Sequence, residues 1–75
     1  METLYEESYF YAVLRDEKTG EYFLEVTCGT SSLFDVRIKL KKAEIESFER
    51  ERTALGVLAA KILDAPQEYV RRRRI

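Results

Sequence analysis

The sequence contains no histidine and a single cysteine, Cys28, among its 75 residues. One cysteine cannot form an internal disulfide. Without histidine the chain lacks the commonest general base and the commonest zinc ligand, and it has no glycine-rich phosphate loop, so we expect no catalytic site, metal or cofactor. Cys28 would be a nucleophile only beside a group that lowers its pKa, and none is evident. We expect it to pack at the end of a strand, in a protein that is not an enzyme.

Long apolar runs are absent too. No run approaches the roughly 20 residues that cross a bilayer, and the acidic start METLYEES has no apolar core of the kind found in signal peptides. We expect a soluble, cytoplasmic protein of bacterial type that does not contact membranes. A chain of this length is a single domain (1–75) that buries only about 60% of its unfolded surface. With disulfides and metals excluded, self-association is the remaining way to supplement so small a core.

Apolar residues recur with the helical period over Ala43–Leu63. Spacings of three, four and seven place them on one face of a helix; they are Ile45, Phe48, Leu55, Leu58, Ala59, Ile62 and Leu63. The opposite face carries Glu46, Arg50, Lys61 and Asp64. Arg52–Ala54 and Gly56 are the expected place of a kink or break. Pro66 suits the first position of a short second helix, which precedes a basic tail.

Three strands are predicted before this helix, over Tyr9–Arg15, Glu21–Cys28 and Phe34–Lys41. The third alternates most cleanly, with Phe34, Val36, Ile38 and Leu40 facing inward. Asp16–Gly20 reads as a hairpin loop with Gly20 at a position of positive φ. Residues 1–8 show no clean period and are expected to be loose. We therefore predict an α+β fold, a three-stranded antiparallel β-meander packed on one long α-helix, plus a short C-terminal helix (β-β-β-α-α).

The first strand has apolar residues on both faces. Pairing Asp16 with Glu21 across the loop sets Val13 opposite Leu24, on the side of the helix. The other face then carries Phe10, Ala12, Leu14 and Phe23. One covering helix would leave these four residues in water, and a contiguous apolar patch is typical of a partner surface. We predict that they form a protein interface, either in a homodimer or with another protein.

Two alternatives to this interface remain open. The tail residues Tyr69, Val70 and Ile75 could fold back over the patch. The strand register could also differ from the one assumed, which would move the first strand's side chains to other faces.

Charge is unevenly distributed along the chain, although the net charge is −1. Residues 1–35 have two basic against eight acidic residues, and residues 36–75 have eleven against six. The basic residues that could contact nucleic acid are Arg37, Lys39, Lys41, Lys42, Arg71, Arg72, Arg73 and Arg74. Arginine runs neutralise phosphate well. Lysines on the solvent side of an alternating strand also discourage edge pairing, which is the structural alternative for Lys39 and Lys41.

The order of three strands then a helix, with Lys41-Lys42 where the helix starts, resembles the C-terminal part of a double-stranded RNA-binding domain. The resemblance covers strand order and these two residues; the first helix of that family is absent here. It implies that Lys41 and Lys42 would contact phosphates across the major groove. The predicted function is non-enzymatic protein–protein interaction, of an adaptor, inhibitor or immunity type, with RNA binding as the alternative.

Overall fold

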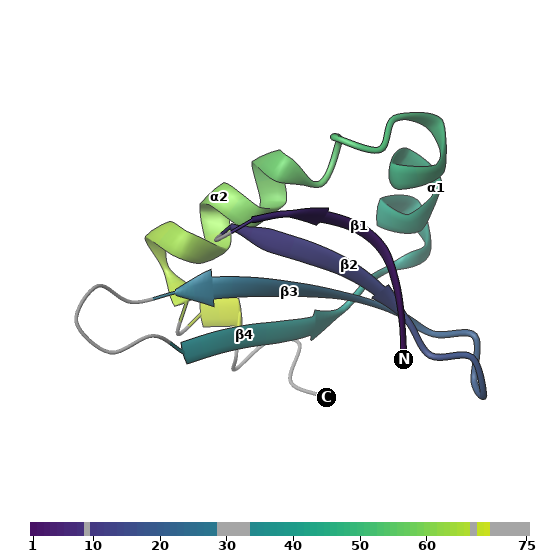
Figure 1. The fold of residues 1–75 in the computed structure, drawn as a ribbon. Helices are drawn as coiled ribbons and strands as arrows, with labels where there is room; N and C mark the ends of the chain where they lie inside the picture. Colours follow the sequence, from purple (N-terminus) through teal and green to yellow (C-terminus); the bar gives the residue numbers. More distant parts are fainter. Residues whose placement is uncertain (9, 29–33, 67, 70–75) are drawn as a thin grey trace.

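The structure is a computed structural model that describes residues 1–8, 10–28, 34–66 and 68–69. Its elements are β1 (Glu2–Glu7), β2 (Tyr11–Arg15), β3 (Tyr22–Cys28), β4 (Phe34–Lys39), α1 (Lys42–Arg50) and α2 (Gly56–Asp64). The strands form one antiparallel sheet in the order β1-β2-β3-β4, and the two helices lie against one face of it (Figure 1). The predicted α+β class with an antiparallel sheet is confirmed. None of the described helices is long and apolar enough to span a membrane.

The predicted number of strands is wrong, because residues 2–7 form the edge strand β1. The pairing of β1 with β2 shifts between Thr3 and Tyr5, which pair with Leu14 and Val13. Leu4 is the extra residue of this bulge. A strand is recognised in a sequence by the alternation of its side chains, and a bulge interrupts that alternation. For this reason β1 could not be recognised from the sequence.

The hairpin between β2 and β3 forms in the predicted register. The amide of Asp16 donates to the carbonyl of Glu21 (2.8 Å), and the amide of Gly20 donates to the carbonyl of Asp16 (2.7 Å). Gly20 has φ +77°, as the loop required. The pairs are Arg15 with Tyr22, Val13 with Leu24 and Tyr11 with Val26. The open alternative of a different register is therefore excluded.

The single long helix is also wrong, since α1 ends at Arg50 and α2 begins at Gly56. Glu51 leaves the helix in an extended conformation (φ −144°, ψ 110°). Glu51 and Arg52 lie three and four residues after the buried Phe48, so a continuous helix would aim both charges at the sheet. The break falls in the segment where the sequence predicted one, and it lets these charges reach water.

One apolar core fills the space between the sheet and the helices. Its strand members are Tyr11, Val13, Leu24, Val26, Cys28, Val36, Ile38 and Leu40, and its helix members are Phe48, Leu55, Ala59 and Ile62. Leu63, predicted on the buried face, is instead 42% exposed at the end of α2. Pro66, Glu68 and Tyr69 are helical, in agreement with a turn of helix after Pro66, and Tyr69 packs against the core.

Candidate interaction surfaces

Two residues of the predicted apolar patch, Leu14 and Phe23, lie on the face of the sheet opposite the core. Leu14 and Phe23 are cross-strand partners there, between Thr3 on β1 and Lys39 on β4. Leu14 is 8% exposed and Phe23 4% exposed. The expectation that these two side chains would lie in water is therefore wrong.

The other two predicted interface residues are half-buried. Phe10 packs against the core and meets Tyr11 edge to face, with ring centroids 4.8 Å apart. Ala12 lies in a cross-strand row between Glu6 and Glu25. Because carboxylates flank Ala12 and Phe10 is part of the fold, the four residues do not form a contiguous apolar surface. Their role as an interface stays a prediction.

The tail was the alternative cover for this face. Tyr69 packs against the core cluster, which lies on the helix side of the sheet. Val70 and Ile75 lie outside the described residues.

The basic residues of β4 are paired with Glu25 of β3 and with Glu21, the residue just before β3. Arg37 Nη2 lies 2.5 Å from Glu25 Oε2, and its Nε donates to the same oxygen at 3.0 Å. The Lys39 ammonium forms an ion pair with the Glu21 carboxylate. Hydrogen bonds from Lys39 and then Thr19 lower the pKa of the Glu21 carboxyl from its ordinary value. Two of the cations predicted for phosphate thus already have counter-charges.

Lys41 and Lys42 are exposed at the start of α1. Lys41 is the N-cap, where an ammonium offers no acceptor to the free amides. The Glu44 carboxylate compensates, because it accepts the backbone N–H of Lys41 at 2.8 Å. The four terminal arginines, Arg71 to Arg74, lie outside the described residues.

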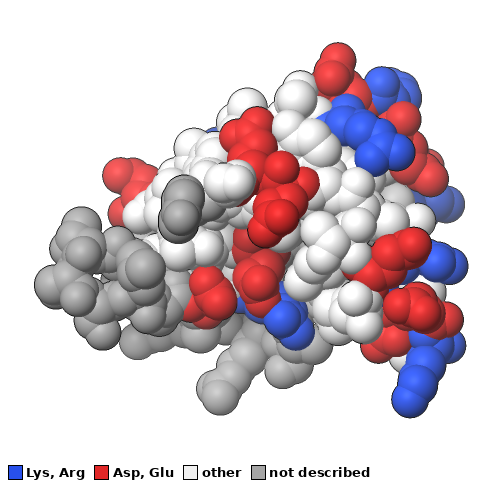
Figure 2. All heavy atoms as spheres, viewed as in Figure 1, with Lys and Arg blue, Asp and Glu red and all other residues white. Residues whose placement is uncertain are grey.

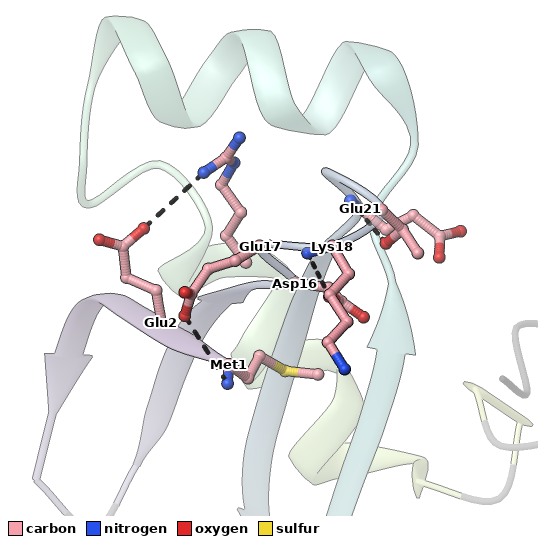
Figure 3. Close-up of polar contacts among 8 residues, drawn as sticks. Met1, Glu2, Asp16, Glu17, Lys18 and Glu21 are labelled. Carbon is pink, nitrogen blue, oxygen red and sulfur yellow. Dashed lines mark hydrogen bonds and ion pairs between the residues drawn. The ribbon is translucent and has the colours of Figure 1, made fainter.

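Several carboxylates gather at the β2–β3 loop, where the chain start meets the hairpin (Figure 3). Glu17 Oε1 lies 3.9 Å from the amino terminus of Met1, and Glu2 Oε1 lies 3.9 Å from Arg15 Nη1. Asp16 Oδ1 accepts the backbone N–H two residues along the loop at 2.9 Å. These contacts connect the hairpin and its flanking strand to the start of the chain.

Cys28 is the last residue of β3 and is 2% exposed, so its predicted packing at a strand end is confirmed. Its Sγ lies 3.7 Å from the carbonyl of Val26. Burial, and after it the Asp35 carboxylate, raises the pKa of the thiol. Both effects disfavour the thiolate.

The most exposed apolar side chains of the helices lie on α2, a surface that the sequence analysis missed. Val57 is 67% exposed and Leu63 is 42% exposed, with exposed Ala60 between them. Figure 2 shows acidic and basic atoms crowded around the β2–β3 loop, whereas the region of α2 has mainly uncharged atoms with acidic atoms beside them. The signal was in the composition: α2 reads GVLAAKILD, and two charged residues in nine cannot make its whole outer face polar.

A groove between α1 and α2 lies beside Val57 at one edge of this surface. It encloses about 300 Å³ and is lined by Ala43, Glu44, Ser47, Ala54, Leu55, Val57, Leu58 and Lys61. Its α1 side has two small side chains, Ala43 and Ser47, and the longer, charged Glu44. A protruding apolar side chain of a partner could enter such a groove.

In comparisons with known proteins, no family model, no curated protein and no solved structure matches this chain.

Proposed function

We propose that this protein is a small, non-enzymatic protein–protein interaction module whose contact surface is the outer face of α2. This surface, the α2 face, consists of Val57, Ala60, Leu63 and Asp64. The exposure of Val57 (67%) on a regular helix carries the proposal. Burying a valine of this kind contributes on the order of 1–2 kcal/mol, which is a reason to find it covered in an assembly.

The α2 face supports the proposal better than the sheet does. Apolar side chains on α2 are exposed next to a groove, whereas Leu14 and Phe23 are already buried within one chain. Interfaces typically combine such an apolar centre with a polar rim. Here Lys61 lies on the rim of the groove and Asp64 at the end of the helix.

Photo-cross-linking in cells tests the α2 face. A photoreactive amino acid replaces Val57 in one variant and Glu46, an exposed residue of α1, in a matched control. We expect protein adducts from position 57 and few from position 46, and we expect Leu63→Lys to abolish them. Equal yields at both positions, or no adduct at position 57, would contradict the proposed function.

RNA binding is the alternative proposal, through Lys41, Lys42 and the terminal arginines. Its support is weakened by the pairing of Arg37 with Glu25 and of Lys39 with Glu21. Removal of residues 71–75 distinguishes the two functions. If nucleic acid co-purifies with the full chain and is lost with the tail, while position 57 yields no adducts, the alternative is favoured.

A further inference from the structure

We infer that the partner of the α2 face is a second copy of this chain, whose α2 packs antiparallel to the first with Ala60 at the two-fold axis. This inference rests on the proposed function of the α2 face. It adds the identity of the partner and the direction and register of the two helices.

The arrangement of side chains around α2 selects Ala60 as the centre. A helix turns by about 100° per residue, so Ala60 points between the directions of Val57 and Leu63. Asp64 points between Val57 and Ala60. The smallest of these side chains therefore lies in the middle of the α2 face, where it lets two helix backbones approach closely.

An antiparallel pair about Ala60 makes the same apolar contact twice. Each of Val57 and Leu63 is three residues from the centre, about 4.5 Å along the axis, so Val57 of one copy meets Leu63 of the other. Contact with the leucine of the second copy would cover part of the exposed Val57 side chain, and the two-fold axis repeats the contact, as an isologous interface requires.

Charge also favours the antiparallel direction. In this register Asp64, the last residue of α2, lies level with Gly56, the first residue of the other α2. The N-cap of α2 is Leu55, whose side chain accepts no hydrogen bond from the first turn. A carboxylate near that positive helix end is stabilising. A parallel pair would instead set Asp64 against its own copy.

Asp64 is available for this role. It is exposed, and none of the ion pairs among the described residues involves it. The contact is also one that a chain of 75 residues has reason to make, because its own core is small and contains no disulfide.

Cysteine cross-linking of the purified full chain under oxidised glutathione tests the register. Cys28 can stay, because it is 2% exposed. We expect Ala60→Cys to form a covalent dimer by itself. Val57→Cys alone and Leu63→Cys alone should cross-link poorly, since equal positions are offset by about 9 Å along the axis, beyond the reach of a disulfide. A mixture of these two variants should cross-link.

Each other pattern overturns the inference. Efficient self-cross-linking of Val57→Cys would indicate a parallel pair. A purified chain that light scattering shows to be monomeric up to millimolar concentration would exclude a second copy. In that case adducts at position 57 with a different polypeptide would leave the proposed function standing, whereas the absence of all adducts would contradict both.

The contribution of Asp64 is tested by Asp64→Asn, with Glu46→Gln on α1 as the control that removes a charge away from the α2 face. We expect the dimer dissociation constant to rise about two- to five-fold for Asp64→Asn at low salt, with a smaller rise at high salt. The control should leave it unchanged. An unchanged or tighter Asp64→Asn dimer would contradict the placement of Asp64 at the partner's helix end.

Discussion

At the scale of single residues, replacing either of two glycines by alanine should change the free energy of unfolding in opposite directions. Gly20 has φ +77°, so Gly20→Ala strains the backbone and should lower the free energy of unfolding by about 1 kcal/mol. At Gly56 a Cβ would lie 3.6 Å from Tyr11 Oη, an ordinary contact. Gly56→Ala should therefore raise the free energy of unfolding by about 0.5 kcal/mol, through helix propensity and unfolded-chain entropy. Urea unfolding of both variants measures the two effects; equal signs would contradict this assignment.

Tyr11 links stability to alkaline pH. Its hydroxyl is buried and has no hydrogen-bond partner among the described residues. Burial first, then the charge of Glu7 and the nearby Tyr5, raises the pKa of Tyr11 from 10.0 to about 12. The folded state thus favours the neutral phenol. The stability that this contributes is fully present below pH 10. Between pH 10 and 12 the unfolded chain loses the proton first, so folding should lose on the order of 2 kcal/mol.

The substitution Tyr11→Phe isolates this effect. It removes the ionisable group and a buried, unpaired hydroxyl, so it should be neutral or slightly stabilising at pH 7. Denaturant unfolding at several pH values should show a smaller loss for Tyr11→Phe than for the natural chain above pH 10. Parallel pH profiles would show that Tyr11 titrates as it does in the unfolded chain.

The turn between the helices is tied to the edge strand β1 through Arg52. Its Nη1 donates to the carbonyl of Leu4 at 3.0 Å, and its guanidinium lies 5.8 Å from the centre of the Phe48 ring. Arg52→Ala should cost about 1 kcal/mol of stability and speed amide exchange in β1 more than in β3. The control is Arg50→Ala, at an exposed last residue of α1. Equal exchange rates in Arg52→Ala and the control would refute this role.

Strands and helices could be predicted from the sequence where a single local sequence pattern determined them. The β2–β3 hairpin followed from alternation and from a glycine at the turn, and its register is the one expected. β1 could not be found this way, because the bulge at Leu4 destroys its alternation. The helical period placed the buried residues of both helices correctly, with Leu63 at the end of α2 as the exception. Because the helical pattern continues through the break, it does not reveal the cost of pointing Glu51 and Arg52 at the sheet.

The candidate surface was less predictable than the fold, because exposure depends on what covers each face. The strand pattern placed Leu14 and Phe23 correctly on the outer face, yet it could not show that both would be buried. Val57 was not predicted as a contact residue from the sequence, because it lies off the apolar stripe of the helix. It is the shortage of polar residues in α2 that makes Val57 informative.

For the whole molecule, the unequal charge of its two halves is partly balanced within the sheet. The strands β3 and β4 are neighbours, and ion pairs join Glu25 of β3 to Arg37 and Glu21, just before β3, to Lys39. Exposed pairs of this kind contribute little stability, about 0–1 kcal/mol each. They give Arg37 and Lys39 counter-charges on β4, which favours the proposed α2 face over this sheet face as a contact surface.

Cys28 offers a test of the proposed self-association in the intact protein. Its thiol is 2% exposed and burial raises its pKa, so a thiol reagent should reach it only when the core opens. Association of two folded chains stabilises the closed state by mass action. Labelling should therefore slow as protein concentration rises above the dissociation constant. Val57→Lys should label at a rate independent of concentration and equal to that of the dilute natural chain. A natural chain whose labelling rate never changes with concentration would show that opening of its core is not coupled to self-association.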